Sequence, residues 1–139
     1  MYRQSIVSEL LLKLEEIKIN NGFYSDAGAN VLEWFDKPLE EEDFPALIVR
    51  DPSDNVVDST SLEHKLKIEI DIAHKGKNCI WNMREASSDV LKAFKNLEDS
   101  IGHQCKYLGS ESLVEQKEKL YGGMRLEFEI IYHTRRWEQ

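Results

Sequence analysis

The chain has 139 residues, 41% of them hydrophobic, and a formal net charge of -8 at pH 7. This length suits a single domain over residues 1–139 with one hydrophobic core. The negative charge argues against a general nucleic-acid-binding protein, because such a surface repels phosphates. No apolar run approaches the roughly 18 residues that cross a bilayer, so we expect no membrane partner.

The acidic excess lies in the first part of the chain. Residues 1–60 carry 13 acidic and 5 basic side chains, whereas residues 61–139 carry 13 of each. The acids are densest at 40–43, with Asp36 shortly before them. Such a patch can steer a basic protein partner, or it can be a solvated loop that only aids solubility. The composition leaves both interpretations open.

The N-terminal segment predicts a helix. Asn20, Asn21 and Gly22 predict its end, because Asn and Gly tolerate the left-handed backbone of a helix cap. Charged residues interrupt the apolar positions, which is not typical of a signal peptide, so we expect the chain to stay in the cytoplasm. The apolar residues recur at spacings of three and four and form one stripe: Ile6, Val7, Leu10, Leu11, Leu14 and Ile17.

The two glycines of the next stretch, Gly22 and Gly28, raise the question of a phosphate-binding loop. The order of elements argues against one, because phosphate loops run from a strand to a helix and here a helix comes first. Neither GxGxxG nor GxxxxGK[ST] occurs. We interpret the stretch as a helix end followed by a tight turn at 26–28. Its aromatic residues are expected to pack the helix onto a sheet: Phe23, Tyr24 and Trp34.

Three segments between residues 31 and 75 predict strands. Residues 31–35 alternate between two faces, and residues 45–51 open at a proline that lacks an amide donor. Residues 51–55 have the composition of a turn, and we expect a mobile loop as far as residue 61. The clearest strand covers 63–75, where an apolar face alternates with a charged one.

The remaining chain predicts a helix over 79–96, a loop over 99–104 and two late strands. Residues 106–118 form the weaker, polar strand, and residues 124–134 alternate strongly after a turn or bulge at 121–123. The predicted fold class is α+β, with a mixed, mainly antiparallel sheet of four to five strands packed against two amphipathic helices.

No residue pattern indicates catalysis. The histidines lie in no nucleophile or metal motif, and His74 continues the apolar face of its strand, where a hydrogen-bonded core or rim position is expected. Glu69 and Asp71 are expected on the solvent-exposed face of the strand, where carboxylates stay ionised. Cys79 and Cys105 are expected to be reduced thiols. We therefore expect no catalytic, cofactor-binding or metal-binding residues, and a small enzyme with an unrecognised site is the least favoured function.

Short motifs in a fixed order resemble a known family. An amphipathic helix precedes an NGF-x-x-DAG-x-x-V turn and an aromatic residue over 21–34, and a Pro-Ala-Leu-x-Val-x-Asp strand follows within 43–51. The last strand ends in Tyr-His-Thr at 132–134. In this order the features resemble the small tail-terminator or tail-completion proteins of tailed bacteriophages and prophages, those similar to minor tail protein U. The likeness covers nearly the whole chain, although residues 52–61 and 106–118 add nothing to it.

The resemblance implies a structural role without catalysis or cofactors. Such proteins form a ring, usually hexameric, on the head-proximal end of a finished tail, where the ring stops tube growth and offers a surface for joining the head. The implied partners are further copies of the chain, the major tail tube protein and the head–tail joining protein. The implied location is the host cytoplasm during assembly and then the virion tail. Family members are often monomers until they meet the tail. A head–tail joining protein or another interaction adaptor of (pro)phage origin is the alternative.

A ring needs two unlike patches on each subunit, because every contact is head-to-tail. The charge pattern supplies a candidate pair of patches. The acidic loop could instead face the lumen of the ring, where an acidic surface repels the passing DNA. The candidate residues are Asp36, Glu40, Glu41, Glu42 and Asp43 on the acidic side and Lys65, Lys67, Lys75 and Lys77 on the basic side.

Overall fold

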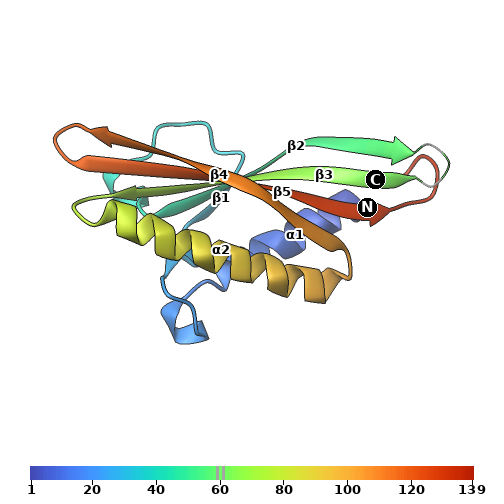
Figure 1. Cartoon of the computed structure of the whole chain (residues 1–139), viewed down its shortest axis with the longest axis horizontal. Helices are drawn as coiled ribbons and strands as arrows, with labels where there is room; N and C mark the ends of the chain where they lie inside the picture. Colours follow the sequence, from blue (N-terminus) through green and yellow to red (C-terminus); the bar gives the residue numbers. More distant parts are fainter. Residues whose placement is uncertain (59, 61) are drawn as a thin grey trace.

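Five strands form one mixed sheet in the order β1-β2-β3-β5-β4 (Figure 1). The computed structural model describes residues 1–58, 60 and 62–139. β1 runs parallel to β2, and every other pair of neighbours is antiparallel, so the predicted α+β class is confirmed. The bounds are Val31–Glu33 for β1, Ala46–Asp58 for β2, Glu63–Lys75 for β3, Gln104–Gln116 for β4 and Leu120–His133 for β5.

Two helices, α1 (Tyr2–Glu15) and α2 (Cys79–Ile101), lie on the same face of the sheet (Figure 1). We call the other face of the sheet the open face. The β2–β3 and β4–β5 hairpins project toward opposite ends of the molecule, and the two termini lie close together. No described helix is long and apolar enough to cross a membrane.

The core lies between the two helices and the sheet. Alternate residues of β3 are buried along its whole length, as the period of two predicts. Phe94 of α2 stacks on Phe128 of β5, with ring centroids 3.6 Å apart. The buried apolar residues form one cluster that includes both helices and the inner strands, so a single hydrophobic core holds the layers together.

The first helix ends earlier than the Asn-Asn-Gly sequence predicts. It stops at Glu15, and a separate 3-10 turn, η1 (Ile19–Asn21), follows. Gly22 then caps that turn with a left-handed φ of 86°. Gly28, in the 3-10 turn η2 (Ala27–Ala29), packs against the end of α1, where a Cβ would lie 2.3 Å from the carbonyl oxygen of Leu14. This close approach explains a glycine at that position.

The turn predicted at 51–55 is wrong, and so is the loop predicted over 52–61 as far as residue 58, because β2 continues to Asp58. The pairing of β2 with β3 shifts between Arg50 and Ser53. A bulge at this point places Pro52 where no ladder hydrogen bond is needed. Positions 59 and 61 of the predicted loop lie outside the described residues.

Three smaller expectations are also corrected. α2 continues to Ile101, so residues 99–101 of the loop predicted at 99–104 are helix. Residues 121–123 belong to β5, where Gly122 leaves room for Met83, whose Cε would lie 2.8 Å from an added Cβ. Phe23 is buried as expected, but Tyr24 and Trp34 are 69% and 50% exposed and do not pack the helix onto the sheet.

Candidate interaction surfaces

The acidic loop, residues 36–43, lies between β1 and β2 and contains the 3-10 turn η3 (Glu41–Asp43). Two of its acids close this turn. The backbone amide of Glu40 donates to Asp43 Oδ2 at 2.7 Å, and the Asp43 amide donates to the backbone carbonyl of Glu40 at 3.0 Å. Asp36 and Glu42 are exposed and hold no salt bridge within the described part of the chain. Their charges are available to a partner.

Glu41 is held by two lysines of the same chain. Its Oε1 lies 2.7 Å from Lys75 Nζ and 2.5 Å from Lys119 Nζ. Hydrogen bonds from Lys119 and Lys75 lower the pKa of Glu41 to about 2, and Glu41 in turn raises the pKa of Lys119. An inter-subunit contact between Glu41 and Lys75 would therefore have to replace a contact inside the subunit.

The other candidate lysines lie apart from the acidic loop. On the open face, Lys65 Nζ lies 3.9 Å from Glu129, and Lys67 Nζ lies 3.6 Å from Glu69. Lys77 follows the end of β3 and is exposed. The structure therefore brings Lys75 to the acidic loop and does not bring Lys65 or Lys67 there. The role of both sets in a contact between subunits stays a prediction.

The centre of the open face is an ordered charge network. Asp71 Oδ2 accepts from Arg50 at 2.6 Å, and Asp71 Oδ1 accepts from Arg125 Nε at 2.7 Å. Burial by itself raises the pKa of Asp71. The hydrogen bonds from Arg125 and Arg50 lower this pKa by more, so it lies below its ordinary value. A carboxylate that is engaged by two guanidinium groups stays ionised at neutral pH, as the sequence predicts for Asp71.

The edge strand β4 is the most exposed part of the sheet. Four of its apolar side chains are at least 40% exposed, which distinguishes this strand from an ordinary solvated edge. They are Tyr107 at 48%, Leu108 at 50%, Leu113 at 68% and Val114 at 40%. Sequence reasoning found the strand and its polarity but did not identify it as an edge.

A buried polar cluster lies between β2, β3 and the end of β5. Asp54 Oδ2 accepts from Tyr132 at 2.5 Å and lies 3.1 Å from His64 Nδ1, while His64 Nε2 lies 2.8 Å from Thr134 Oγ1. The side chains of Asp54 and His64 are 3% and 6% exposed. Burial, followed by the hydrogen bond to Asp54, raises the pKa of Tyr132. The sequence missed this cluster because Asp54 falls in the predicted loop.

The order Asp54–His64–Thr134 matches carboxylate, base and hydroxyl in a nucleophilic site. Two contacts argue for a structural role. The Thr134 hydroxyl lies 3.2 Å from the carbonyl oxygen of Glu138, and the Thr134 amide donates to the carbonyl of Leu62. The amide beside the hydroxyl is therefore occupied and cannot hold an oxyanion. The cluster fastens the C-terminal residues to β2 and β3.

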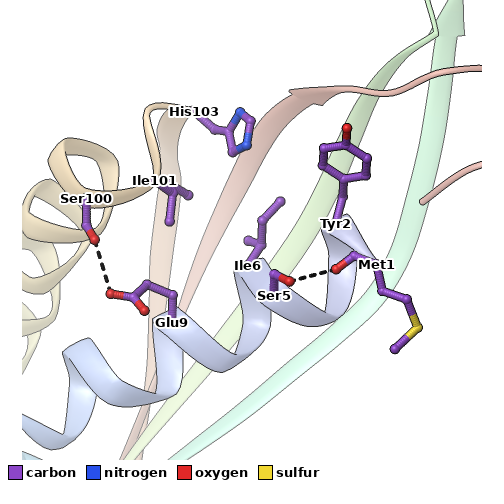
Figure 2. Close-up of a pocket in the computed structure, with 8 residues that line it drawn as sticks. All are labelled: Met1, Tyr2, Ser5, Ile6, Glu9, Ser100, Ile101 and His103. Atoms are coloured by element: carbon purple, nitrogen blue, oxygen red, sulfur yellow. Dashed lines mark hydrogen bonds between the residues drawn. The ribbon is translucent and has the colours of Figure 1, made fainter.

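Two cavities adjoin this end of the molecule. One, of about 880 Å³, is bordered by His64, Thr134 and the exposed Trp137. The other, of about 440 Å³, lies between the first turns of α1 and the end of α2. Figure 2 shows that its carboxylate, Glu9, accepts a hydrogen bond from Ser100 across the groove. Among the described residues that border them, neither cavity combines a free nucleophile with a base.

Within the described residues, the cysteines and acids show no metal-binding arrangement. Cys79 and Cys105 are free, and burial together with nearby Glu98 raises the pKa of Cys105 to about 12. Such a thiol is unreactive at neutral pH. Among residues 1–58, 60 and 62–139, no three His, Cys, Asp or Glu side chains lie close enough to hold a metal ion.

Comparisons with known proteins give little similarity. No family model matches the chain, and no curated protein matches it. Two solved structures of proteins from Akkermansia muciniphila are 13% and 12% identical, with TM-scores of 0.40 and 0.39. They match over 68% and 67% of this chain, which spans 44% and 47% of their lengths; the second is described as lacking its transmembrane region.

Proposed function

We propose that this chain is a structural virion protein of the tail-terminator type. In this proposal, copies of the chain form a ring, hexameric as in similar proteins, on the head-proximal end of a phage tail. The ring ends growth of the tail tube and offers the surface that joins the head. Its partners are the major tail tube protein and the head–tail joining protein, and it carries out no catalysis.

The observation that carries the proposal is the order of elements together with the structural places of the motifs. The Asn-Gly of the NGF motif ends and caps the turn η1, and the DAG motif opens η2 against the end of α1. The Pro-Ala-Leu motif opens β2. Each motif therefore fixes a connection of the fold, as a family marker should.

The surface supports a structural role as well. The sheet has one covered face, one charged open face and two different edge strands. A subunit with unlike edges is suited to head-to-tail contacts, which close into rings when the rotation allows. In such a ring, the acidic loop either contacts the tail tube or faces the lumen of the ring.

The test is electron microscopy of the purified chain mixed with tubes of the major tail protein. We expect density capping one end of each tube and an arrest of tube growth. Tubes that keep growing with bare ends would overturn the proposal. Binding to head connectors without binding to tubes would instead favour a head–tail joining protein.

A double variant with reversed charges tests whether the acidic loop contacts the tail tube. Asp36→Lys with Glu42→Lys changes two exposed acids that hold no salt bridge among the described residues. If the loop contacts the tube, this variant should cap fewer tube ends than the wild type. The matched control, Glu15→Lys with Asp99→Lys, reverses two exposed acids on the helices. Equal capping by both variants would remove the loop from the tube contact.

A further inference from the structure

The sheet ends in two edges that are free in the described chain. β1 pairs only with β2, and β4 pairs only with β5. On either side of β1, the carbonyl of Asn30 and the amide of Trp34 bond to β2. Because backbone groups alternate in direction along a strand, the amides and carbonyls of Val31 and Glu33 point away from β2. Free groups of this kind form a template for a further strand.

The directions of the two edges fit a head-to-tail contact between copies. β1 is parallel to β2, and three antiparallel steps then lead through β3 and β5 to β4. β4 therefore runs opposite to β1. When two copies lie side by side with their open faces on the same side, β4 of one copy meets β1 of the next in antiparallel orientation.

The apolar residues of the two edges also match by face. Directly paired residues of neighbouring strands lie on the same face of the sheet. Leu32 pairs with Ile48, and Ile48 pairs with Asp71 on the open face. Leu113 pairs with Gly123, which also lies on the open face. Leu32 and Leu113 therefore share that face. Leu113 is 68% exposed in the single chain, so a partner that covers it buries apolar surface.

The neighbouring pair lies on the helix-covered face. Val114 pairs with Gly122, which packs on Met83 of α2, and Val31 pairs with the buried Leu47. Val31 and Val114 therefore point to the same side of the sheet. One antiparallel register satisfies both matches at once, because Leu113 opposite Leu32 places Val114 opposite Val31.

The flanking polar residues are complementary in the same register. Ser112 lies opposite Glu33, and Asn30 lies opposite Glu115. The Ser112 hydroxyl can donate to Glu33, and the Asn30 amide, which already donates to the Asp43 carbonyl, has a second N–H for Glu115. No like charges face each other over this span. A register shifted by one residue would place the apolar side chains on opposite faces.

We infer that β4 of one subunit pairs antiparallel with β1 of the next, with Leu113 opposite Leu32, so that the sheet continues from subunit to subunit. The occupant of each edge is a second copy of this chain. The contact joins unlike surfaces and therefore propagates to a closed ring or an open filament. This inference rests on the proposed ring and names the surface that builds it.

Cysteine cross-linking tests the contact directly. Facing residues of an antiparallel pair lie about 4.5–5.5 Å apart between Cα atoms, which suits a disulfide. Under oxidation, an equimolar mixture of Leu32→Cys and Leu113→Cys should give covalent dimers, and the double variant should give a ladder of multimers. Each experiment is run on the purified chain at high concentration and again with tail tubes. The matched control combines Leu113→Cys with Leu12→Cys, which lies on the exposed side of α1, and should give no ladder.

Each result decides a separate question. Cross-linking of Leu113→Cys to itself would indicate a two-fold β4–β4 contact and would overturn the inference. The absence of any link between positions 32 and 113, both with and without tail tubes, would overturn it as well. Tubes that are capped without such a link would overturn the edge contact and leave the proposed function intact. A ladder from a chain that never caps tubes would overturn the proposed function and leave the edge contact intact.

Discussion

At the residue scale, the structure separates side chains that look alike in the sequence. Asp71 and Glu41 both belong to charged stretches, yet Asp71 lies within a network of two arginines and Glu41 joins the acidic loop to the end of β3 and to the β4–β5 turn. His74 lies on the core face as predicted and is 9% exposed. Its Nε2 finds no hydrogen-bond partner among the described residues, so the expected hydrogen bond at that atom is absent.

His74 gives the protein a pH-dependent stability. Burial lowers its pKa below the ordinary value of 6.5, so below about pH 6.5 the unfolded chain binds a proton that the folded chain does not. The free energy of unfolding should therefore fall between pH 7.5 and pH 5.5. Burial lowers the pKa of His103 as well, with a further contribution from His133, so part of the fall belongs to that residue.

The variant His74→Leu isolates the contribution of His74. Urea unfolding should show a smaller loss of stability on acidification than in the wild type, because the buried titrating group is gone. The difference between the two proteins should grow as the pH falls from 7.5 to 5.5. Parallel pH profiles would show that His74 is accessible to protons in the folded state.

At the element scale, single contacts decide how the irregular segments attach to the helices. Asp89 of α2 is 1% exposed and accepts three hydrogen bonds from Tyr24 and Ser25, the shortest of 2.6 Å from the Ser25 hydroxyl. It therefore anchors the turn that follows α1. The sequence identified Asp89 only as a residue within the second helix, because its partners are more than 60 positions away.

Removing this anchor should be costly. Asp89→Ala leaves two backbone amides without their acceptor, and we expect the free energy of unfolding to fall by about 3 kcal/mol. Asp89→Asn keeps an acceptor oxygen and should lose less. Asp99→Ala, an exposed position on the same helix, should stay within about 0.5 kcal/mol of the wild type in the same denaturant titration.

At the scale of the whole molecule, the sheet joins a protected centre to two exposed edges. β3 is paired on both sides, by β2 and β5, and its inner residues lie under the helices. β4 is paired on one side and is mostly exposed. The most stable backbone of such a molecule lies in the centre of the sheet, and the least protected backbone lies at the edges.

Hydrogen exchange should show this gradient. In the free chain, amides of β3 and the buried half of β5 should exchange most slowly, and the outward amides of β4 should exchange quickly. On assembly, exchange in residues 111–115 should slow, because the inferred contact gives these amides partners. Slow exchange of all β4 amides in the dilute free chain would show that this edge is already covered.

The sequence by itself determined the number and order of the main elements, the fold class and the inner face of β3. Hydrophobic periodicity is a local property, so it can be read along the chain without knowing which elements meet. The same reasoning was wrong at Pro52, because the turn-forming composition there predicted a loop. Pairing with β3 keeps this segment in a strand that contains a bulge.

Only the tertiary structure decided which side chains meet across the sheet. It joined Glu41 to Lys75 and Lys119, and it placed Asp54 beside His64 and Tyr132. It also made β4 an edge, because the strand order puts β5 between β3 and β4. Contacts of this kind depend on register and strand order, which local composition does not encode.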